Sequence, residues 1–140
     1  MTTPGRDPRR FLQSAAAVLA GLLEVVVLSI GTDAVLHLTG VFPPPDQPVG
    51  DAFFLLATTY RTLYAVVGSY VAARMAPARP MRHAMALGVV ALVIGVVGAV
   101  VTWGRGPVDG PAWYPIALMF LALPAAWAGG VLALMRQSEA

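Results

Sequence analysis

Long apolar runs separated by proline, glycine and charged residues dominate the pattern along this chain. Four of them cover residues 11–30, 53–73, 84–103 and 113–135. About 20 mostly apolar residues form a helix that crosses about 30 Å of hydrocarbon, so we predict four transmembrane helices. The first run is longer than the apolar part of an export signal and lacks a clear small-x-small cleavage motif, so we interpret it as a retained span.

Composition supports this interpretation. Hydrophobic residues make up 58% of the chain and charged residues 11%, whereas soluble domains carry about 25% charged residues. So few charges cannot cover a globular surface, and we expect lipid to surround an all-α, polytopic four-helix bundle. A net charge of +2 gives no indication of nucleic-acid binding. The chain has no Cys, which excludes disulfide and thiol chemistry.

The basic residues predict the orientation of the spans, because Arg and Lys concentrate in cytoplasmic segments. Both termini and the connection between the second and third spans are therefore predicted to be cytoplasmic (N-in, C-in). We divide the chain into a tail (1–10), a transmembrane domain (11–136) and a second tail (137–140). Seven Arg lie on the predicted cytoplasmic side and one on the other, namely Arg6, Arg9, Arg10, Arg74, Arg79, Arg82 and Arg136 against Arg105.

Two charged residues interrupt the apolar runs, Glu24 in the first and Arg61 in the second. At 1.5 Å per residue, Glu24 lies about 12–14 Å below an outer boundary near Asp33, and Arg61 about 12 Å below the same surface. Charges at such depth cost several kcal/mol unless they pair or face water. We therefore predict an intramembrane Glu24–Arg61 ion pair between neighbouring spans. Four residues are candidates to complete its hydrogen bonds: Ser29, Thr58, Tyr60 and Tyr64.

The predicted pair is open to two interpretations. In the structural one, it locks the first two spans together and fixes their register. In the functional one, Glu24 loads a proton or cation, and Arg61 tunes it or binds an anion. A neighbouring guanidinium keeps a carboxylate ionised and so makes it a poorer proton carrier. We therefore favour the structural interpretation.

Small residues predict how the later spans pack. Helices in lipid associate by close backbone approach, and small residues at steps of three and four share one helix face. We predict a tight antiparallel hairpin of spans three and four, with span four kinked at Pro124. The packing residues are Gly88, Ala91, Gly95 and Gly98 in span three, together with Gly129 and Gly130 in span four.

The remaining polar residues give weaker signals. Asp33 and His37 share a helix face if the first helix continues past residue 30, but they supply only half of a metal site, and we expect no metal. Arg74, Arg79 and Arg82 are candidates to hold anionic lipid headgroups, although the same bias arises from topology alone. The chain has no zinc-protease, phosphate-loop or nucleophile-elbow motif. We therefore expect neither enzyme activity nor a cofactor.

Residues 68–88 carry a recognisable pattern, with GSYVAARMAP at 68–77, RPMRHA at 79–84 and LG at 87–88. Together with Tyr60-Arg61 and Trp113-Tyr114-Pro115, this pattern resembles a family of small four-helix proteins of the bacterial inner membrane with unknown activity. The resemblance covers about half of the chain. It implies residence in that membrane and contributes no catalytic residues.

A second resemblance concerns architecture alone. Small multidrug-resistance exporters are also short four-helix proteins, with a proton- and drug-binding glutamate in the first span. Glu24 is similarly placed, whereas Arg61 and the proline-rich stretch 41–48 depart from that pattern. We therefore expect a structural or accessory membrane protein, with a small ion-coupled transporter using Glu24 as the alternative. A second copy of this chain or another membrane protein is the candidate protein partner.

Overall fold

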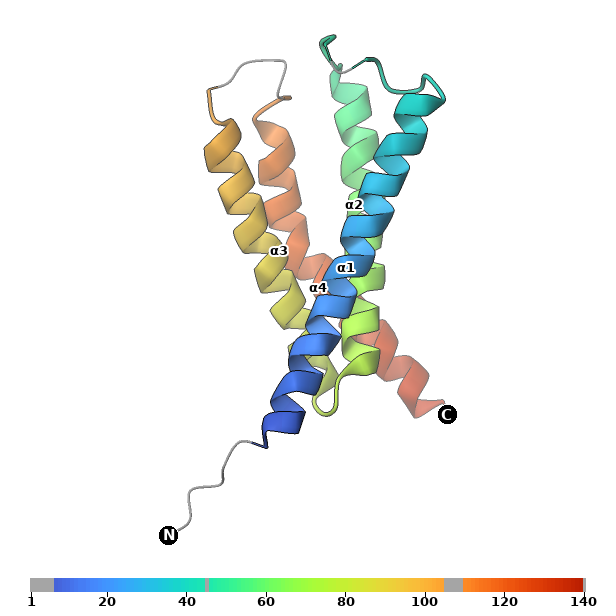
Figure 1. Cartoon of the computed structure of the whole chain (residues 1–140), viewed down its shortest axis with the longest axis vertical. Coiled ribbons are helices and arrows are strands. Elements are labelled where there is room, and N and C mark those ends of the chain that lie inside the picture. Colours follow the sequence, from blue (N-terminus) through green and yellow to red (C-terminus); the bar gives the residue numbers. More distant parts are fainter. Residues whose placement is uncertain (1–6, 45, 105–109, 140) are drawn as a thin grey trace.

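The computed structural model describes residues 7–44, 46–104 and 110–139. They form four helices that run alternately up and down (Figure 1). Each predicted apolar run lies within one helix, except that the third helix ends one residue earlier than expected. The helices are α1 (Pro8–Leu38), α2 (Asp51–Met75), α3 (Pro80–Thr102) and α4 (Trp113–Ser138).

Three of these helices, α1, α3 and α4, are long and apolar enough to cross a membrane. They indicate a membrane protein. The α2 helix has 25 residues, which is also the length of a span. Its centre, Thr58–Tyr64, contains three threonines, two tyrosines and Arg61, so α2 is the least apolar of the four.

Local sequence signals explain where two of the helices begin. Pro8 occupies the first turn of α1, and the Asp7 side chain accepts a hydrogen bond from the Arg9 backbone N–H at 3.1 Å. Such a cap satisfies a donor that the helix itself leaves unpaired. Pro80 begins α3, where its fixed φ suits the first turn. The preceding Arg79 has φ of 50°, which reverses the chain tightly between α2 and α3.

One end of the bundle holds the start of α1, the end of α4 and the α2–α3 connection, and we call it the tail end; the opposite end is the far end (Figure 1). Most buried residues lie in the half of each helix nearer the tail end. Nearly all of them are small: Ala17, Gly21, Gly68, Ser69, Ala72, Ala73, Ala84, Leu87, Gly88, Ala125, Ala126, Gly129, Gly130 and Ala133.

Glycine allows this close packing. A Cβ on Gly68 would lie 2.6 Å from the Gly21 carbonyl oxygen, so α1 and α2 cross with their backbones in contact. A Cβ on Gly129 would collide with the Val66 carbonyl oxygen and lie 2.8 Å from the Ser69 Cβ. Real Cβ contacts do not approach this closely, so only glycine fits at these positions.

The predicted α3–α4 packing residues are distributed more widely than expected. Gly88 meets Ala126, and Gly95 meets Met119, so both lie between α3 and α4. Gly130 likewise faces α3, through Met81 and Ala84.

Two of the predicted packing glycines lie elsewhere. Gly129 faces α2 instead of α3, and Gly98 has open space around it. The physical reason is that the helices separate toward the far end, where Gly98 lies. The α4 helix continues through Pro124 and changes direction near its middle (Figure 1).

Candidate functional site

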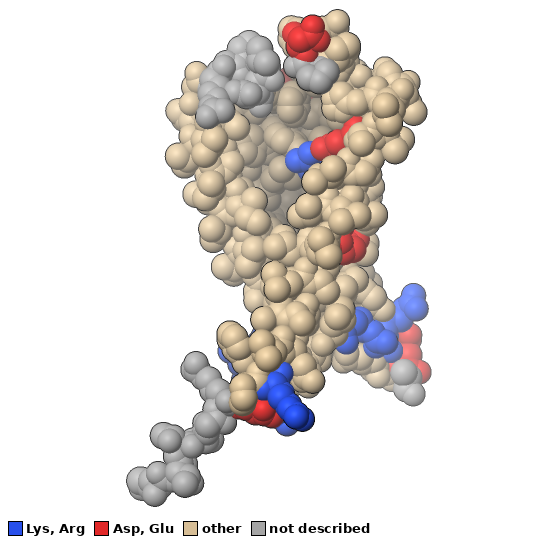
Figure 2. Space-filling model, in the orientation of Figure 1, with Lys and Arg blue, Asp and Glu red and all other residues tan. Residues whose placement is uncertain are grey.

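A cavity of about 310 Å³ lies between the helices, and all four contribute to its wall. Most of the lining is aliphatic, and the polar members are Ser29, Arg61 and Thr62. The space-filling view shows a hollow in the far half of the molecule, with basic and acidic atoms in contact inside it (Figure 2).

Arg61, which lines this cavity from α2, forms an ion pair with Asp33 of α1. The Arg61 Nη2 donates to the Asp33 Oδ2 at 2.5 Å, and the Tyr60 hydroxyl donates to the other oxygen of the same carboxylate. The Arg61 guanidinium also lies 5.8 Å from the centre of the Tyr114 ring, a distance at which a cation is attracted to an aromatic face. The cluster thus joins α1, α2 and α4.

The cluster is only partly enclosed. The Arg61 and Asp33 side chains are 33% and 28% exposed within the chain. The Arg61 Nε is buried and has no hydrogen-bond partner among the described residues. Two partly buried charges beside an apolar cavity are stabilised mainly by the bond between them.

The predicted Glu24–Arg61 pair is wrong, because Arg61 pairs with Asp33. The depth comparison ignored rotation about the helix axis. Asp33 is nine residues beyond Glu24, about two and a half turns, which places the two carboxylates on opposite sides of α1. Ser29 shares the Asp33 side, one turn earlier, and lines the cavity. Glu24 is absent from that lining.

Glu24 instead lies against the crossing of α1 and α2. Both of its carboxylate oxygens are buried and have no hydrogen-bond partner among the described residues. One of them is 2.9 Å from the position a Cβ would take on Gly68. An ionised carboxylate without a partner in such a place costs several kcal/mol. Among the described residues, nothing offsets this cost for Glu24.

The four predicted supporting residues have separate roles. Tyr60 bonds Asp33, and Ser29 lines the cavity. The Tyr64 hydroxyl shares a 2.7 Å hydrogen bond with the Thr32 hydroxyl and so adds a second polar link between α1 and α2. The Thr58 hydroxyl donates to the carbonyl of Phe54 in its own helix at 2.8 Å.

Sequence reasoning missed Thr32, and it missed Asp33 as the partner of Arg61. Asp33 had been used as the outer boundary of the first span, whereas α1 continues through it to Leu38. The sequence did carry a signal for this contact. Thr32 and Asp33 are adjacent polar residues on α1, and Tyr60 and Arg61 are adjacent polar residues on the next helix.

The residues considered for a metal site do not form one. The His37 Nδ1 contacts the Asp33 backbone oxygen at 2.8 Å, whereas the Asp33 carboxylate faces α2. Among the described residues, no three His, Cys, Asp or Glu side chains come together. Arg105, the one arginine predicted on the outer side, lies outside the described residues.

The loop arginines separate into two groups at the tail end. Arg79 and Arg82 line a second cavity, of about 690 Å³, together with Arg10 and His83. Arg74 is not part of its lining. The lipid-binding role predicted for Arg74, Arg79 and Arg82 stays a prediction.

Comparison of the chain with protein-family models, with curated proteins and with solved structures finds no match. The resemblance to small inner-membrane proteins therefore stays a prediction, and the argument for function rests on the geometry.

Proposed function

We propose that this chain is a four-span membrane protein with both termini in the cytoplasm. The described basic residues outside the spans support this orientation, because all of them gather at the tail end, where Figure 2 shows the exposed basic atoms. Such segments stay on the cytoplasmic side during insertion. Arg6 and Arg105 lie outside the described residues, and their sides remain predictions from the sequence.

The α2 helix is the fourth span in this proposal. It packs against the apolar helices, and two of its polar residues are buried there: Tyr60 is 8% exposed and Ser69 is 1% exposed. Arg61 has a counter-ion on α1. A charge with an internal partner inserts at lower cost than a lone one, which accounts for the lower hydropathy of α2.

Within the membrane, the protein has a structural or accessory role without catalysis. The observation that carries this proposal is the use of Arg61, the only basic residue inside a helix centre among the described residues, in bonds within the chain. The Arg61 guanidinium donates to the Asp33 carboxylate, which also accepts a hydrogen bond from the Tyr60 hydroxyl. The Tyr114 ring of α4 lies beside the guanidinium. The cluster holds the far halves of three helices in register.

The topology can be tested by cysteine labelling, because the chain has no Cys of its own. Single variants Ala78→Cys and Ala112→Cys place a thiol at the tail end and the far end. A membrane-impermeant maleimide added to intact cells should label the Ala112 variant and leave the Ala78 variant unlabelled until the cells are opened. Labelling of the Ala78 variant in intact cells would reverse the proposed orientation.

The structural role is tested by a double-mutant cycle at Asp33 and Arg61. Asp33→Asn and Arg61→Gln should each lower the free energy of unfolding in detergent by about 1–3 kcal/mol, because each leaves a charge without its partner. The double variant should lose less than the sum, with a coupling of about 1–2 kcal/mol.

The matched control is a cycle of Glu24→Gln with Arg61→Gln, which should show no coupling because these side chains do not meet. Strictly additive losses at Asp33 and Arg61 would remove the structural proposal.

A second candidate is an ion-coupled transporter with Glu24 as the coupling carboxylate. The observation that favours it is the absence of a hydrogen-bond partner for both Glu24 oxygens among the described residues. Arg61 forms its ion pair with Asp33, so it does not hold Glu24 in its ionised form. A proton or a cation would relieve the cost of this buried charge, and binding one is the first step of coupling.

This candidate is tested in proteoliposomes that contain a pH-sensitive dye. An imposed proton gradient should decay faster with the wild-type protein than with Glu24→Gln, while Glu24→Asp retains part of the activity. If wild type and Glu24→Gln both decay as slowly as empty liposomes, Glu24 is not a proton-coupling group.

A further inference from the structure

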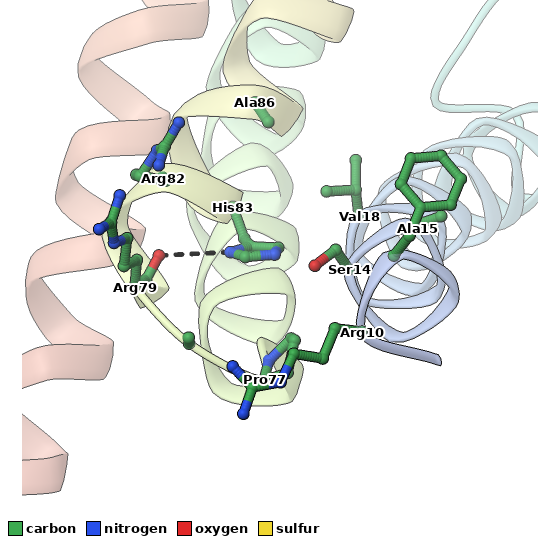
Figure 3. Close-up of a pocket in the computed structure, with 11 residues that line it drawn as sticks. Arg10, Ser14, Ala15, Val18, Pro77, Arg79, Arg82, His83 and Ala86 are labelled. Atoms are coloured by element: carbon green, nitrogen blue, oxygen red, sulfur yellow. Dashed lines mark hydrogen bonds between the residues drawn. The ribbon is translucent and has the colours of Figure 1, made fainter. Parts of the chain in front are cut away.

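The larger cavity, of about 690 Å³, is an open groove at the tail end, between the first turns of α1 and the start of α3. The close-up shows the Ser14 hydroxyl and the His83 ring facing each other across it, with Arg10 reaching below them toward Pro77 (Figure 3). Segments far apart in sequence therefore contribute polar groups to one groove.

The His83 ring is held in place by its own helix turn. Its Nδ1 contacts the Arg79 backbone oxygen at 3.2 Å, shown as the dashed line in Figure 3. Arg79 itself has φ of 50°, a conformation that side-chain-bearing residues rarely adopt. Arg79 and Arg82 also line the groove, but their guanidinium groups lie on the side of α3 away from Ser14 and Arg10 (Figure 3).

The groove carries positive charge that no ion pair among the described residues neutralises. Arg10, Arg79 and Arg82 line it, and none of them forms an ion pair with any described residue, since the only such pair joins Arg61 and Asp33. No acidic side chain contributes to the lining. The Arg10 guanidinium and the His83 imidazole face the groove, and the charges of Arg79 and Arg82 lie beside it, an arrangement that favours an anion with several oxygen acceptors.

The walls of the groove become apolar away from the tail. Ala15 and Val18 follow Arg10 along α1, and Ala86 follows His83 along α3. Both helices continue from there as apolar segments long enough to cross a membrane. A bound molecule would thus have its charged part among the arginines and an apolar part beside the helices, which is the chemistry of a phospholipid and not of free phosphate.

We propose that this groove binds the phosphate headgroup of an anionic phospholipid, with Arg10, His83 and Ser14 contacting the headgroup and one acyl chain lying along Val18 and Ala86. Arg79 and Arg82 add positive potential at its rim. The site differs from a general basic surface because Arg74 and Arg136, at the same end of the bundle, do not line it.

The test is native mass spectrometry of the full chain released from detergent with added lipid. The probes are phosphatidylglycerol and phosphatidylcholine with identical acyl chains, followed by competition with inorganic phosphate. The wild type should retain phosphatidylglycerol at least fivefold better than phosphatidylcholine, since each arginine near a headgroup is worth about 1 kcal/mol. Inorganic phosphate at millimolar concentration should displace little of the lipid.

Three variants distinguish the groove from the surface. Arg10→Gln and His83→Gln should each lower phosphatidylglycerol retention several-fold, whereas Arg136→Gln, an equal loss of charge on α4, should change it less than twofold. Arg10 and Arg136 are exposed, so both variants should fold, and circular dichroism checks this. The measurement is made in detergent and does not depend on the proposed orientation.

Equal losses in the Arg10 and Arg136 variants would show a diffuse attraction and overturn the site. Equal retention of the two lipids would show that the groove does not recognise the headgroup. Complete displacement by inorganic phosphate would assign the groove to a free anion.

Discussion

The two halves of the bundle are built from different residues and pack differently. In the tail half, Ala73, Ala84 and Ala133 are each fully enclosed and form a common core. In the far half, the helix pairs separate around a cavity, and long side chains such as Tyr114 and Phe54 fill part of the space. The tail half is held by backbone contact, and the far half by polar and aromatic side chains.

This difference shows that the same helices can be fixed in two ways in one molecule. Small residues give short interhelical distances and tolerate little change, because the backbone of the neighbour lies where a larger side chain would go. The far half has space that larger groups can enter. Substitutions of equal chemistry should therefore have unequal effects at the two ends.

The largest effect is expected from adding volume to the tail half. Ala84→Leu should lower the free energy of unfolding by about 3 kcal/mol or more, since three added carbons have no space between α3 and α4. Ala91→Leu, seven residues later on the same face of α3, points into the far cavity and should change stability by less than about 1 kcal/mol. Thermal unfolding in detergent, followed by circular dichroism, measures both. Equal losses would end the distinction between the halves.

A smaller change at a glycine sharpens the same comparison. Gly129→Ala should destabilise the protein by about 2 kcal/mol, because its Cβ would collide with the backbone of α2 at Val66. Gly98→Ala is the control in open space and should be neutral or stabilising by up to about 1 kcal/mol, as alanine favours the helix. The same unfolding assay applies, and a neutral Gly129→Ala would contradict the close α2–α4 approach.

The smallest effect is expected at the second polar link of the far half. Thr32→Val and Tyr64→Phe each remove the 2.7 Å hydrogen bond between α1 and α2. Each should cost about 0.6 kcal/mol, the usual value for such bonds in membrane proteins, and the double variant should lose no more than one single variant. A loss above about 2 kcal/mol would mean that this bond, and not the Asp33–Arg61 pair, holds the far half together.

The sequence was sufficient for the helices but not for their relative rotation. Apolar runs of about 20 residues leave few alternatives to helices in lipid, so the four segments were predictable from length alone. The stripe from Gly88 to Gly95 also indicated the α3–α4 contact. Gly98 continues that stripe, yet it lies in open space, because a residue pattern does not show where two helices begin to separate.

The candidate site was predictable in kind but not in its members. An arginine within a span requires a counter-ion, and this reasoning correctly assigned Arg61 a carboxylate on the preceding helix. Glu24 and Asp33 are both on that helix, and the choice between them depends on which side of α1 faces the cavity. That side is set by the contact of Gly21 with Gly68, which is a property of the packed pair.

The position of Gly129 also determines how this bundle can deform. Its contact with α2 lies about two-thirds of the way along both helices toward the tail end, so the parts of α2 and α4 beyond it are longer on the far side. A small rotation of α4 about this contact moves the far ends of the two helices more than their tail ends. The width of the far opening therefore depends on a contact in the tail half, made by a residue that has no side chain.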